Sequence, residues 1–384
     1  MTPENEAPAV RRATQEDMPA LLQFVGETYG AGAPYKDRAR HHWQFEDTPF
    51  KADTTADPTI WLAEDGGRII GTIAVQDGAL WVGGRAVPAS WIVDVMVHPE
   101  ARGRGLSHRI HDRVIVERKV LVTLTMAAAT RRVAERAGCL TLGPVGQFIL
   151  PHGLSGRTVA RFLKYKSQFG SLGRRRLLRA FVSTEIGPWI VAALGRATAK
   201  ARRLSAPKPS AGTDATAIRE VSLFPDEIDT LWQQARPHFP VVFERSAQFL
   251  NWRFVDCPGL TYRRFLLYRG DALAGYLVTR VGEPEELPLG VVADAFALPD
   301  DPATLDALLA HAVAVLAPES DYLEAAASHP AWQQALRRAG FLRTRTMRPT
   351  VVCTDPVLRD ELASFLDDWH FTKADHDWDQ VHPV

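Results

Sequence analysis

Cysteine is scarce in this sequence, and so are long apolar runs and any excess of charge of one sign. The chain of 384 residues has three cysteines, Cys139, Cys257 and Cys353, which lie far apart and form no CxxC pair. This scarcity argues against a disulfide framework and against a zinc site, so no metal is expected. No apolar run reaches the roughly 20 residues that a membrane-spanning helix needs.

The charges balance, because lysine and arginine together number 45, as do aspartate and glutamate. A neutral chain has no general attraction to DNA or to an anionic membrane. Residues 1–6 lack a basic segment and an apolar core, so we expect no signal peptide and a cytoplasmic location. The length is sufficient for two domains with packed cores.

Residues 91–107 form the most informative segment of the sequence. Residues 92–97 are rich in β-branched side chains and predict a buried strand. Pro99 ends that strand, because proline has no N–H group to donate within a sheet. Apolar residues at helical spacing then predict a helix that begins at Leu106: Ile110, Val114, Ile115 and Leu121.

The loop between this strand and this helix is basic and contains two glycines. Gly103 and Gly105 permit a tight backbone without side chains. Backbone N–H groups at a helix N-terminus bind anions, and the helix dipole adds to the attraction. Arg102 and Arg104 contribute positive charge. We therefore expect this loop to bind a pyrophosphate.

The two halves of the chain resemble each other at four landmarks in the same order. The shared features are a W-x-F-x-D-x-P motif, a strand–turn–strand ending in glycine, a strand with Asp and Pro, and a helix ending in Ala-Gly. The pairs lie 200 to 209 residues apart: 43–49 with 252–258, 60–71 with 265–275, 93–99 with 293–299, and 134–139 with 336–341. Nearly constant spacing predicts duplication of one domain.

The strand, turn, loop and helix resemble the acyl-CoA-binding motif of the GNAT family (Gcn5-related N-acetyltransferases). The family loop is Gln/Arg-x-x-Gly-x-Gly/Ala, and this chain has Arg102 to Ser107 in its place, with serine at the last position. The resemblance implies an α/β (α+β) fold with two tandem GNAT-like domains. Each would be a mostly antiparallel mixed sheet flanked by helices.

The resemblance also implies which residues bind acetyl-CoA or another acyl-CoA. The backbone N–H groups of Val95 and Val97 would serve the acyl carbonyl and the pantetheine arm. The pyrophosphate would lie on the loop, whose residues are Arg102, Gly103, Arg104, Gly105, Leu106 and Ser107.

Asp94 is the candidate base, since burial in an apolar strand would raise its pKa. Asp294 holds the matching place in the second half, so a structural role for Asp94 stays open. Glu64 and Glu100 are alternative bases.

Many family members protonate the leaving thiolate with a tyrosine on a late helix. Ala134 and Leu336 stand at that place in the two halves. Either a tyrosine from elsewhere, Tyr29 or Tyr35, serves instead, or the thiolate leaves unaided.

The second half has Pro-Asp-Asp-Pro at 299–302 where the loop should be, and its acids would repel a pyrophosphate. The sequence therefore predicts three parts in the chain. Residues 1–150 form a catalytic GNAT domain, 151–213 a basic helical connector and linker, and 214–384 a GNAT-like domain without the loop.

The function implied is transfer of an acetyl or longer acyl group from CoA to a primary amine, by direct attack in a ternary complex. The acceptor would be a small molecule, an amino sugar or a peptide. Two alternatives remain: a non-catalytic CoA-binding scaffold, or an aminoacyl-tRNA-dependent transferase. The connector could be a membrane or polyanion patch, or helices packed on the domains. The acidic and aromatic tail after Trp369 predicts a docked strand rather than a metal site.

Overall fold

The computed structural model describes residues 8–29, 37–124, 128–160, 184, 186–205, 216–282 and 289–380. Contacts group the chain into two compact units, each built from three stretches of sequence. Unit 1 is Met1–Gly143, Pro240–Leu260 and Arg348–Trp369, and unit 2 is Pro144–Phe239, Thr261–Met347 and His370–Val384. The three-part scheme divides the chain linearly, whereas these contacts place segments of each half in the other unit.

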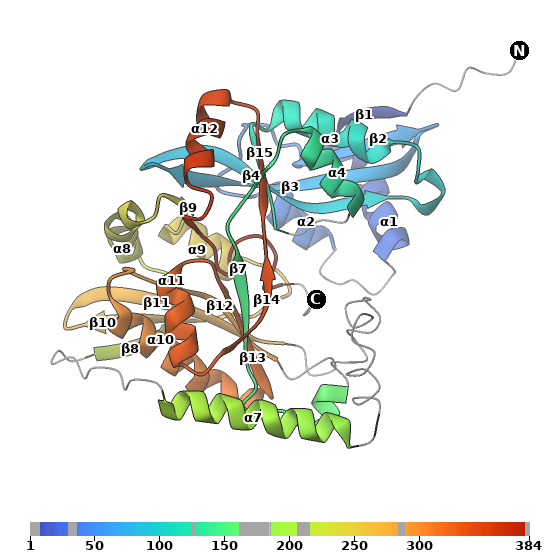
Figure 1. Cartoon of the computed structure of the whole chain (residues 1–384). Helices are drawn as coiled ribbons and strands as arrows, with labels where there is room; N and C mark the ends of the chain where they lie inside the picture. Colours follow the sequence, from blue (N-terminus) through green and yellow to red (C-terminus); the bar gives the residue numbers. More distant parts are fainter. Residues whose placement is uncertain are drawn as a thin grey trace, which may run out of the picture. The chain divides into compact units, whose positions relative to one another are not determined.

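The expected fold class is confirmed, because both units contain a mixed, mostly antiparallel sheet flanked by helices (Figure 1). The elements of unit 1 are β1 (Ala9–Arg12), η1 (Gln15–Asp17), α1 (Met18–Tyr29), α2 (Arg38–Phe45), β2 (Ile60–Asp65), β3 (Arg68–Val82), β4 (Arg85–Val97), η3 (Pro99–Ala101), α3 (Leu106–Glu117), β5 (Val120–Thr123), α4 (Ala128–Arg136), β6 (Leu140–Thr141), β9 (Val241–Phe243), α9 (Ala247–Phe254), β15 (Thr350–Cys353) and α12 (Pro356–Ser364).

The elements of unit 2 are β7 (Val145–Leu150), α7 (Gly187–Ser205), β8 (Thr216–Val221), α8 (Glu227–Ala235), η4 (Arg236–His238), β10 (Arg263–Arg269), β11 (Ala272–Val281), β12 (Leu289–Ala297), α10 (Pro302–Leu316), η5 (Ala317–Glu319), β13 (Tyr322–Ala327), α11 (Pro330–Arg338) and β14 (Leu342–Met347). The short β16 (Trp369–His370) follows α12 and pairs with β9. None of the described helices is both long and apolar enough to cross a membrane.

The sheet of unit 1 has the order β1-β2-β3-β4-β5-β15-β6, and β9 also pairs with β3. β3 and β4 form a long hairpin joined by Gly83 and Gly84, which both have positive φ, +54° and +85°. Such turns match the twist of antiparallel strands. The neighbours pair antiparallel except for β4 and β5, which are parallel.

Each face of this sheet has its own apolar core. On one face α3 contributes Leu106, Ile110 and Val114, which pack against strand side chains such as Ile73. On the other face α1 and Phe45 of α2 pack against a second set of strand side chains. Alternation of side chains along the strands thus supplies two buried surfaces, and the loop before α3 lies at the end of the first.

The helix predicted from Leu106 is present as α3, but its extent was overestimated. α3 ends at Glu117, and Leu121 lies in β5 rather than on the helix. Arg118 already has extended geometry, with φ −122° and ψ 109°. The β-branched, buried run after it favours a strand over another helical turn.

The sheet of unit 2 has the order β14-β7-β13-β12-β11-β10-β8. It repeats the plan of unit 1, with β12 and β13 as the parallel pair. Each half of the chain also contributes a strand to the sheet of the other half. β7, from the first half of the chain, lies between β13 and β14, and β15, from the second half, lies between β5 and β6.

The twin W-x-F motifs pack against each other inside unit 1. Trp43 on α2 and Trp252 on α9 are buried, and their rings stack with centroids 4.6 Å apart. Each indole N–H donates to the backbone carbonyl of the other tryptophan, at 2.8 and 3.2 Å. The two tryptophans therefore anchor a buried contact between α2 and α9.

The connector is described only in part. Within the predicted helical connector, the apolar stretch at 177–182 lies outside the described residues, whereas the one at 189–194 lies in α7. α7 exposes Trp189 and Leu194 and buries Ala192. The large apolar side chains of α7 are thus exposed, so its burial does not follow the apolar face expected of an amphipathic helix.

Candidate functional site

The loop between β4 and α3 is an exposed turn held open by two glycines. Gly103 and Gly105 have φ of +80° and +74°, which side chains with a Cβ rarely adopt. A Cβ at either position would meet no atom within 4 Å, so the space above the loop is open. Leu106 anchors the loop from below, because its side chain is buried in the core.

Backbone N–H groups gather at this loop without protein acceptors. Gly105 is the N-cap of α3 and has no side chain to accept from the first turn. Within the described part of the chain, no oxygen accepts from the N–H groups of residues 103–107. Unsatisfied donors at a helix N-terminus attract an anion, and the helix dipole adds to that attraction.

Arginine side chains flank these donors. Arg104 donates through Nη2 to Asp65 at 3.0 Å, and Arg102 donates through Nε to the Val97 carbonyl at 3.2 Å. Both residues are exposed, so their remaining guanidinium donors face solvent. Ser107 is half-buried, and its carbonyl lies 2.6 Å from Nδ1 of His111. Burial lowers the pKa of His111, which favours a neutral imidazole behind the loop.

β4 and β5 separate from each other beyond the base of the parallel pair. They are in register only at Ser90 with Leu121 and Trp91 with Val122. Residues 92–97 of β4 therefore continue without pairing to β5. The gap between the two strands opens toward the glycine loop.

Val95 and Val97 turn their backbone groups into this gap. Along a β-strand, the backbone N–H and C=O groups of successive residues point alternately to the two edges of the strand. The N–H of His98 donates to the Ile70 carbonyl on β3 at 2.9 Å. Met96 and Asp94, two and four residues earlier, therefore also face β3. Val95 and Val97 face the opposite edge, and the bond from Arg102 to the Val97 carbonyl agrees with that direction.

Asp94 lies next to an irregularity in β4. Asp94 is in register with Ala74, but the next pair is Ile92 with Val75, so Val93 is an extra, bulged residue. Bulges often reorient side chains beside active sites. The Asp94 side chain is buried, with 6 % of the residue exposed.

The alternative acids and bases lie in less suitable surroundings. Glu64 is paired with Arg11 at 3.0 Å, and the Glu100 side chain is 80 % exposed. Ala134 belongs to the core and offers no proton. Tyr35 lies outside the described residues, as does the side chain of Tyr29.

Unit 2 carries the same elements with different side chains. Its bulge falls at Ala293, beside Asp294, and its parallel pair is β12 with β13. The N-terminus of α10 is capped by Asp301, whose carboxylate accepts from the Thr304 N–H at 3.0 Å and pairs with Arg269 at 3.1 Å. Pro302 further removes one backbone donor. An aspartate thus occupies the place where unit 1 exposes its donors.

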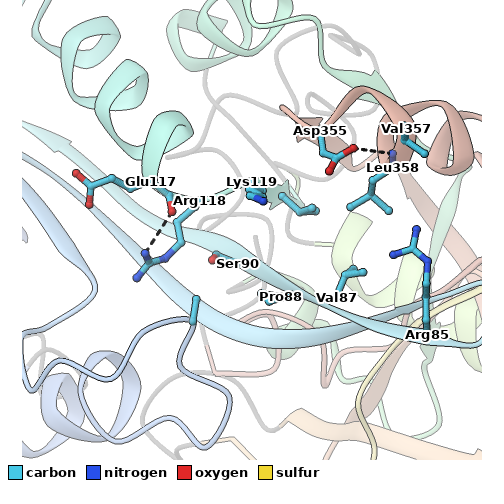
Figure 2. A pocket seen from close by; sticks show the side chains of 12 residues that line it. Arg85, Val87, Pro88, Ser90, Glu117, Arg118, Lys119, Asp355, Val357 and Leu358 are labelled. Atoms are coloured by element: carbon cyan, nitrogen blue, oxygen red, sulfur yellow. Dashed lines mark hydrogen bonds between the residues drawn. The ribbon is translucent and has the colours of Figure 1, made fainter.

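A separate pocket in unit 1 was not foreseen from the sequence (Figure 2). It has a volume of about 390 Å³ and is lined by Ala52, Arg85, Val87, Pro88, Ser90, Glu117, Arg118, Lys119, Val120, Asp355, Val357 and Leu358. It adjoins the C-terminal end of α3, about 18 Å from the glycine loop for a helix of 12 residues.

The charges of this pocket are largely satisfied by the protein. Arg118 donates to Asp77 at 3.1 Å, and Arg85 pairs with Glu361. The Asp355 carboxylate accepts from the Leu358 N–H at 3.1 Å, as Figure 2 shows. Among the described residues no cluster of three metal-binding side chains occurs.

Comparison with protein families supports the resemblance found in the sequence. A family model described as an acetyltransferase (GNAT) domain matches residues 9–139, which lie within unit 1. No curated protein matches the chain.

Solved structures share the fold over most of the chain. A GCN5-related N-acetyltransferase from Anabaena variabilis has a TM-score of 0.58 at 14% identity and covers 90% of this chain and 72% of its own. A probable N-acyltransferase from Enterococcus faecalis has a TM-score of 0.58 at 10% identity, and the match covers 94% of this chain and 75% of that protein. N-myristoyltransferase from Saccharomyces cerevisiae, with bound myristoyl-CoA, has a TM-score of 0.54 at 11% identity. The match covers 91% of this chain and 83% of that protein. At these identities the likeness concerns the fold.

Proposed function

We propose, from the premise that this chain belongs to the GNAT superfamily and has a tandem GNAT fold, that unit 1 is an acyl-CoA-dependent N-acyltransferase. The observation that carries the proposal is the uncapped N-terminus of α3, where the N–H groups of residues 103–107 have no acceptor among the described residues and two arginines flank them. A pyrophosphate of CoA satisfies these donors and is attracted by both guanidinium groups.

The gap between β4 and β5 would hold the pantetheine arm and the acyl group. The N–H groups of Val95 and Val97 face this gap and are suited to bind carbonyl oxygens there. A donor that meets the acyl carbonyl stabilises the negative charge that develops as the amine attacks. Attack forms the new C–N bond, and collapse breaks the C–S bond and releases the CoA thiolate. Holding both reactants together provides much of the rate increase.

Asp94 is the proposed base that removes the proton from the attacking ammonium. It is a buried carboxylate at a bulge beside Val95. Ala134 leaves the usual position of the acid without a proton donor, so the thiolate takes its proton from solvent.

The test is a pair of measurements on the whole chain. Calorimetry with acetyl-CoA should give saturable binding, and a thiol assay across a panel of primary amines should detect CoA release. The panel should include amino sugars, polyamines and N-terminal peptides. No binding of acetyl-CoA or any longer acyl-CoA would refute the proposal.

Acyl length is the next property to measure, since the fold neighbour from yeast is bound to myristoyl-CoA. A series of acyl-CoA thioesters from two to fourteen carbons, in the same two assays, would identify the preferred donor. Equal affinity along the series would mean that the acyl chain makes no contact beyond its carbonyl.

A non-catalytic CoA-binding role is the second candidate, favoured by the buried alanine at the position of the acid. Tight binding of acetyl-CoA with no thiol release across the amine panel would support it. Salt-sensitive binding of aminoacyl-tRNA would instead support the tRNA-dependent alternative.

A further inference from the structure

Unit 2 contains the same kind of gap between parallel strands as unit 1. β12 and β13 are in register only at Leu289 with Tyr322, Gly290 with Leu323 and Val291 with Glu324. Beyond these pairs, β12 stays joined to β11 and β13 stays joined to β7. The two strands therefore part from each other, as β4 and β5 do.

The C-terminal tail binds the β12 side of this gap. The Thr372 hydroxyl donates to Oδ1 of Asp294 at 2.9 Å. Asp294 is 1 % exposed, and the Tyr276 hydroxyl donates to its other oxygen at 2.8 Å. The aspartate that matches Asp94 thus serves as an anchor for the tail.

The same tail binds the β13 side. The N–H of Ser328 donates to the Phe371 carbonyl at 3.1 Å, and the Phe371 N–H donates to the Ser328 hydroxyl at 2.7 Å. Lys373 forms an ion pair with Glu324 on β13 at 3.2 Å, and both side chains are buried or nearly so. The tail therefore bridges both strands that border the gap.

The open edge of β12 is satisfied from within the unit. Ala295 corresponds to Val95, the donor proposed for the acyl carbonyl in unit 1. The N–H of Ala295 donates to Asp294 at 3.0 Å, and its carbonyl accepts from the Trp332 indole at 2.5 Å. In unit 1 the position that corresponds to Trp332 is Thr130.

Aromatic rings fill the space next to this edge. The His370 ring lies 4.6 Å from Trp332 and 5.8 Å from Phe296 on β12, between ring centroids. Phe239 lies 4.6 Å from the same imidazole. Close-packed rings leave no channel for a pantetheine arm.

We infer that unit 2 is closed to acyl-CoA by the chain itself. Asp301 occupies the anion position at the start of α10, and Thr372, Phe371 and Lys373 occupy the gap between β12 and β13. The chain consequently has one acyl-CoA site, and the tail is an internal ligand of the second. This inference rests on the proposed function, which identifies acyl-CoA as the ligand that unit 2 excludes.

Hydrogen–deuterium exchange on the intact chain, with and without saturating acetyl-CoA, tests this inference. We expect peptides within 369–380 to be as protected as those of β12 and β13, and acetyl-CoA to leave them unchanged. Peptides covering 98–107 should gain protection. Exchange of the tail at the rate of an unstructured peptide would overturn the inference.

A change of tail or β12 protection on adding acetyl-CoA would also overturn it, since the tail would then be displaced by the ligand. A different result, no protection at 98–107 with a protected tail, would refute the proposed function and leave the closed gap intact. The two failures are therefore distinguishable.

Thr372→Val removes the bond from the tail to Asp294 and also the bond that the Thr372 hydroxyl accepts from the Ala374 N–H at 3.2 Å. Loss of these two bonds should speed exchange of the tail by about fivefold or more, with acetyl-CoA affinity unchanged. Thr344→Val on the exposed strand β14 is the matched control and should leave tail exchange unaltered. Equal exchange in both variants would show that Thr372 does not hold the tail.

Discussion

The two helices that follow the parallel strands begin in opposite ways. α3 starts at a glycine with φ +74° and presents N–H donors to solvent, whereas α10 starts at Asp301 and Pro302 and is capped by its own carboxylate. Strand order, parallel pair and bulge are alike in the two units. The contrast teaches that a few side chains at one helix end decide whether its N–H donors find acceptors within the protein.

The paired aspartates extend this contrast into the sheet. Asp294 accepts hydrogen bonds from Tyr276, Thr372 and the Ala295 N–H. That environment accounts for Asp294 without any catalysis. The same residue type at Asp94 is therefore no evidence of a base by itself, and only measurement of both aspartates separates the two roles.

Gly105→Glu should produce the largest effect, because it adds a carboxylate where the pyrophosphate is expected to bind. We expect acetyl-CoA affinity to fall more than 100-fold by calorimetry, about 3 kcal/mol. Gly270→Glu is the control, since Gly270 also has positive φ, at +57°, with open space around it in unit 2. Both variants should lose similar stability from backbone strain, and only the first should lose binding. Equal affinity in the two variants would remove the anion site from the loop.

Asp94→Asn and Asp294→Asn should separate chemistry from stability. Asp294→Asn should reduce the free energy of unfolding by about 1 to 3 kcal/mol, because an amide cannot accept all three hydrogen bonds. Turnover per folded molecule should stay the same. Asp94→Asn should reduce turnover by about 100-fold or more, with a smaller loss of stability. Urea unfolding measures the stability of each variant, and the thiol assay measures its turnover. An Asp94→Asn variant that loses stability but keeps its turnover would make Asp94 structural.

Asp301→Ala should cost about 1 kcal/mol of stability, since it removes the N-cap of α10. Asp301→Asn keeps an acceptor for the Thr304 N–H and should lose less. The variants should differ in thermal midpoint, with acetyl-CoA stoichiometry remaining at one. A second bound acetyl-CoA in Asp301→Ala would show that the cap alone had kept unit 2 closed.

Acid pH should have the smallest and most graded effect. The hydrogen bond from Arg11 lowers the pKa of Asp17 in unit 1 to about 2, from an ordinary 3.8. The resulting stability is present above about pH 4 and is lost as the pH falls toward 2. Arg263 likewise lowers the pKa of Glu220 in unit 2, but that carboxylate is 49 % exposed against 16 % for Asp17.

Asp17→Asn should therefore flatten the acid-dependent part of the unfolding free energy more than Glu220→Gln does. Because Arg11 is itself partly exposed, the difference should stay below about 1 kcal/mol. Urea midpoints at pH 2, 3, 4 and 6 measure it. A larger effect of Glu220→Gln would mean that exposure does not govern these two pairs.

Local features of the site could be predicted from the sequence because they depend on residues close together in the chain. A β-branched run, Pro99 and the two glycines were sufficient for the strand, the turn and the start of α3. The end of α3 was wrong, because Leu121 continues a helical spacing although it lies in β5. Apolar spacing alone cannot show whether a buried residue extends a helix or belongs to the strand that follows it.

Long-range pairing could not be predicted. β7 and β15 are short strands, and nothing in the apolar pattern of either one indicates which sheet it joins. The tail after Trp369 was predicted to dock, but its composition does not show where, since Lys373, Asp375 and Asp379 are typical of surface segments and are buried here. The partners of Asp379 and Lys373, which are Tyr262 and Glu324, are distant in sequence.

The exchange of β7 and β15 has a consequence for how the chain can be cut. A protease that cleaved near residue 210 would leave two fragments, yet each fragment would carry a strand that completes the sheet of the other. Neither fragment could be purified as an independent domain under native conditions, and the nicked protein should remain associated through backbone hydrogen bonds. Deletion of residues 214–384 would likewise remove β9 and β15 from the sheet of unit 1.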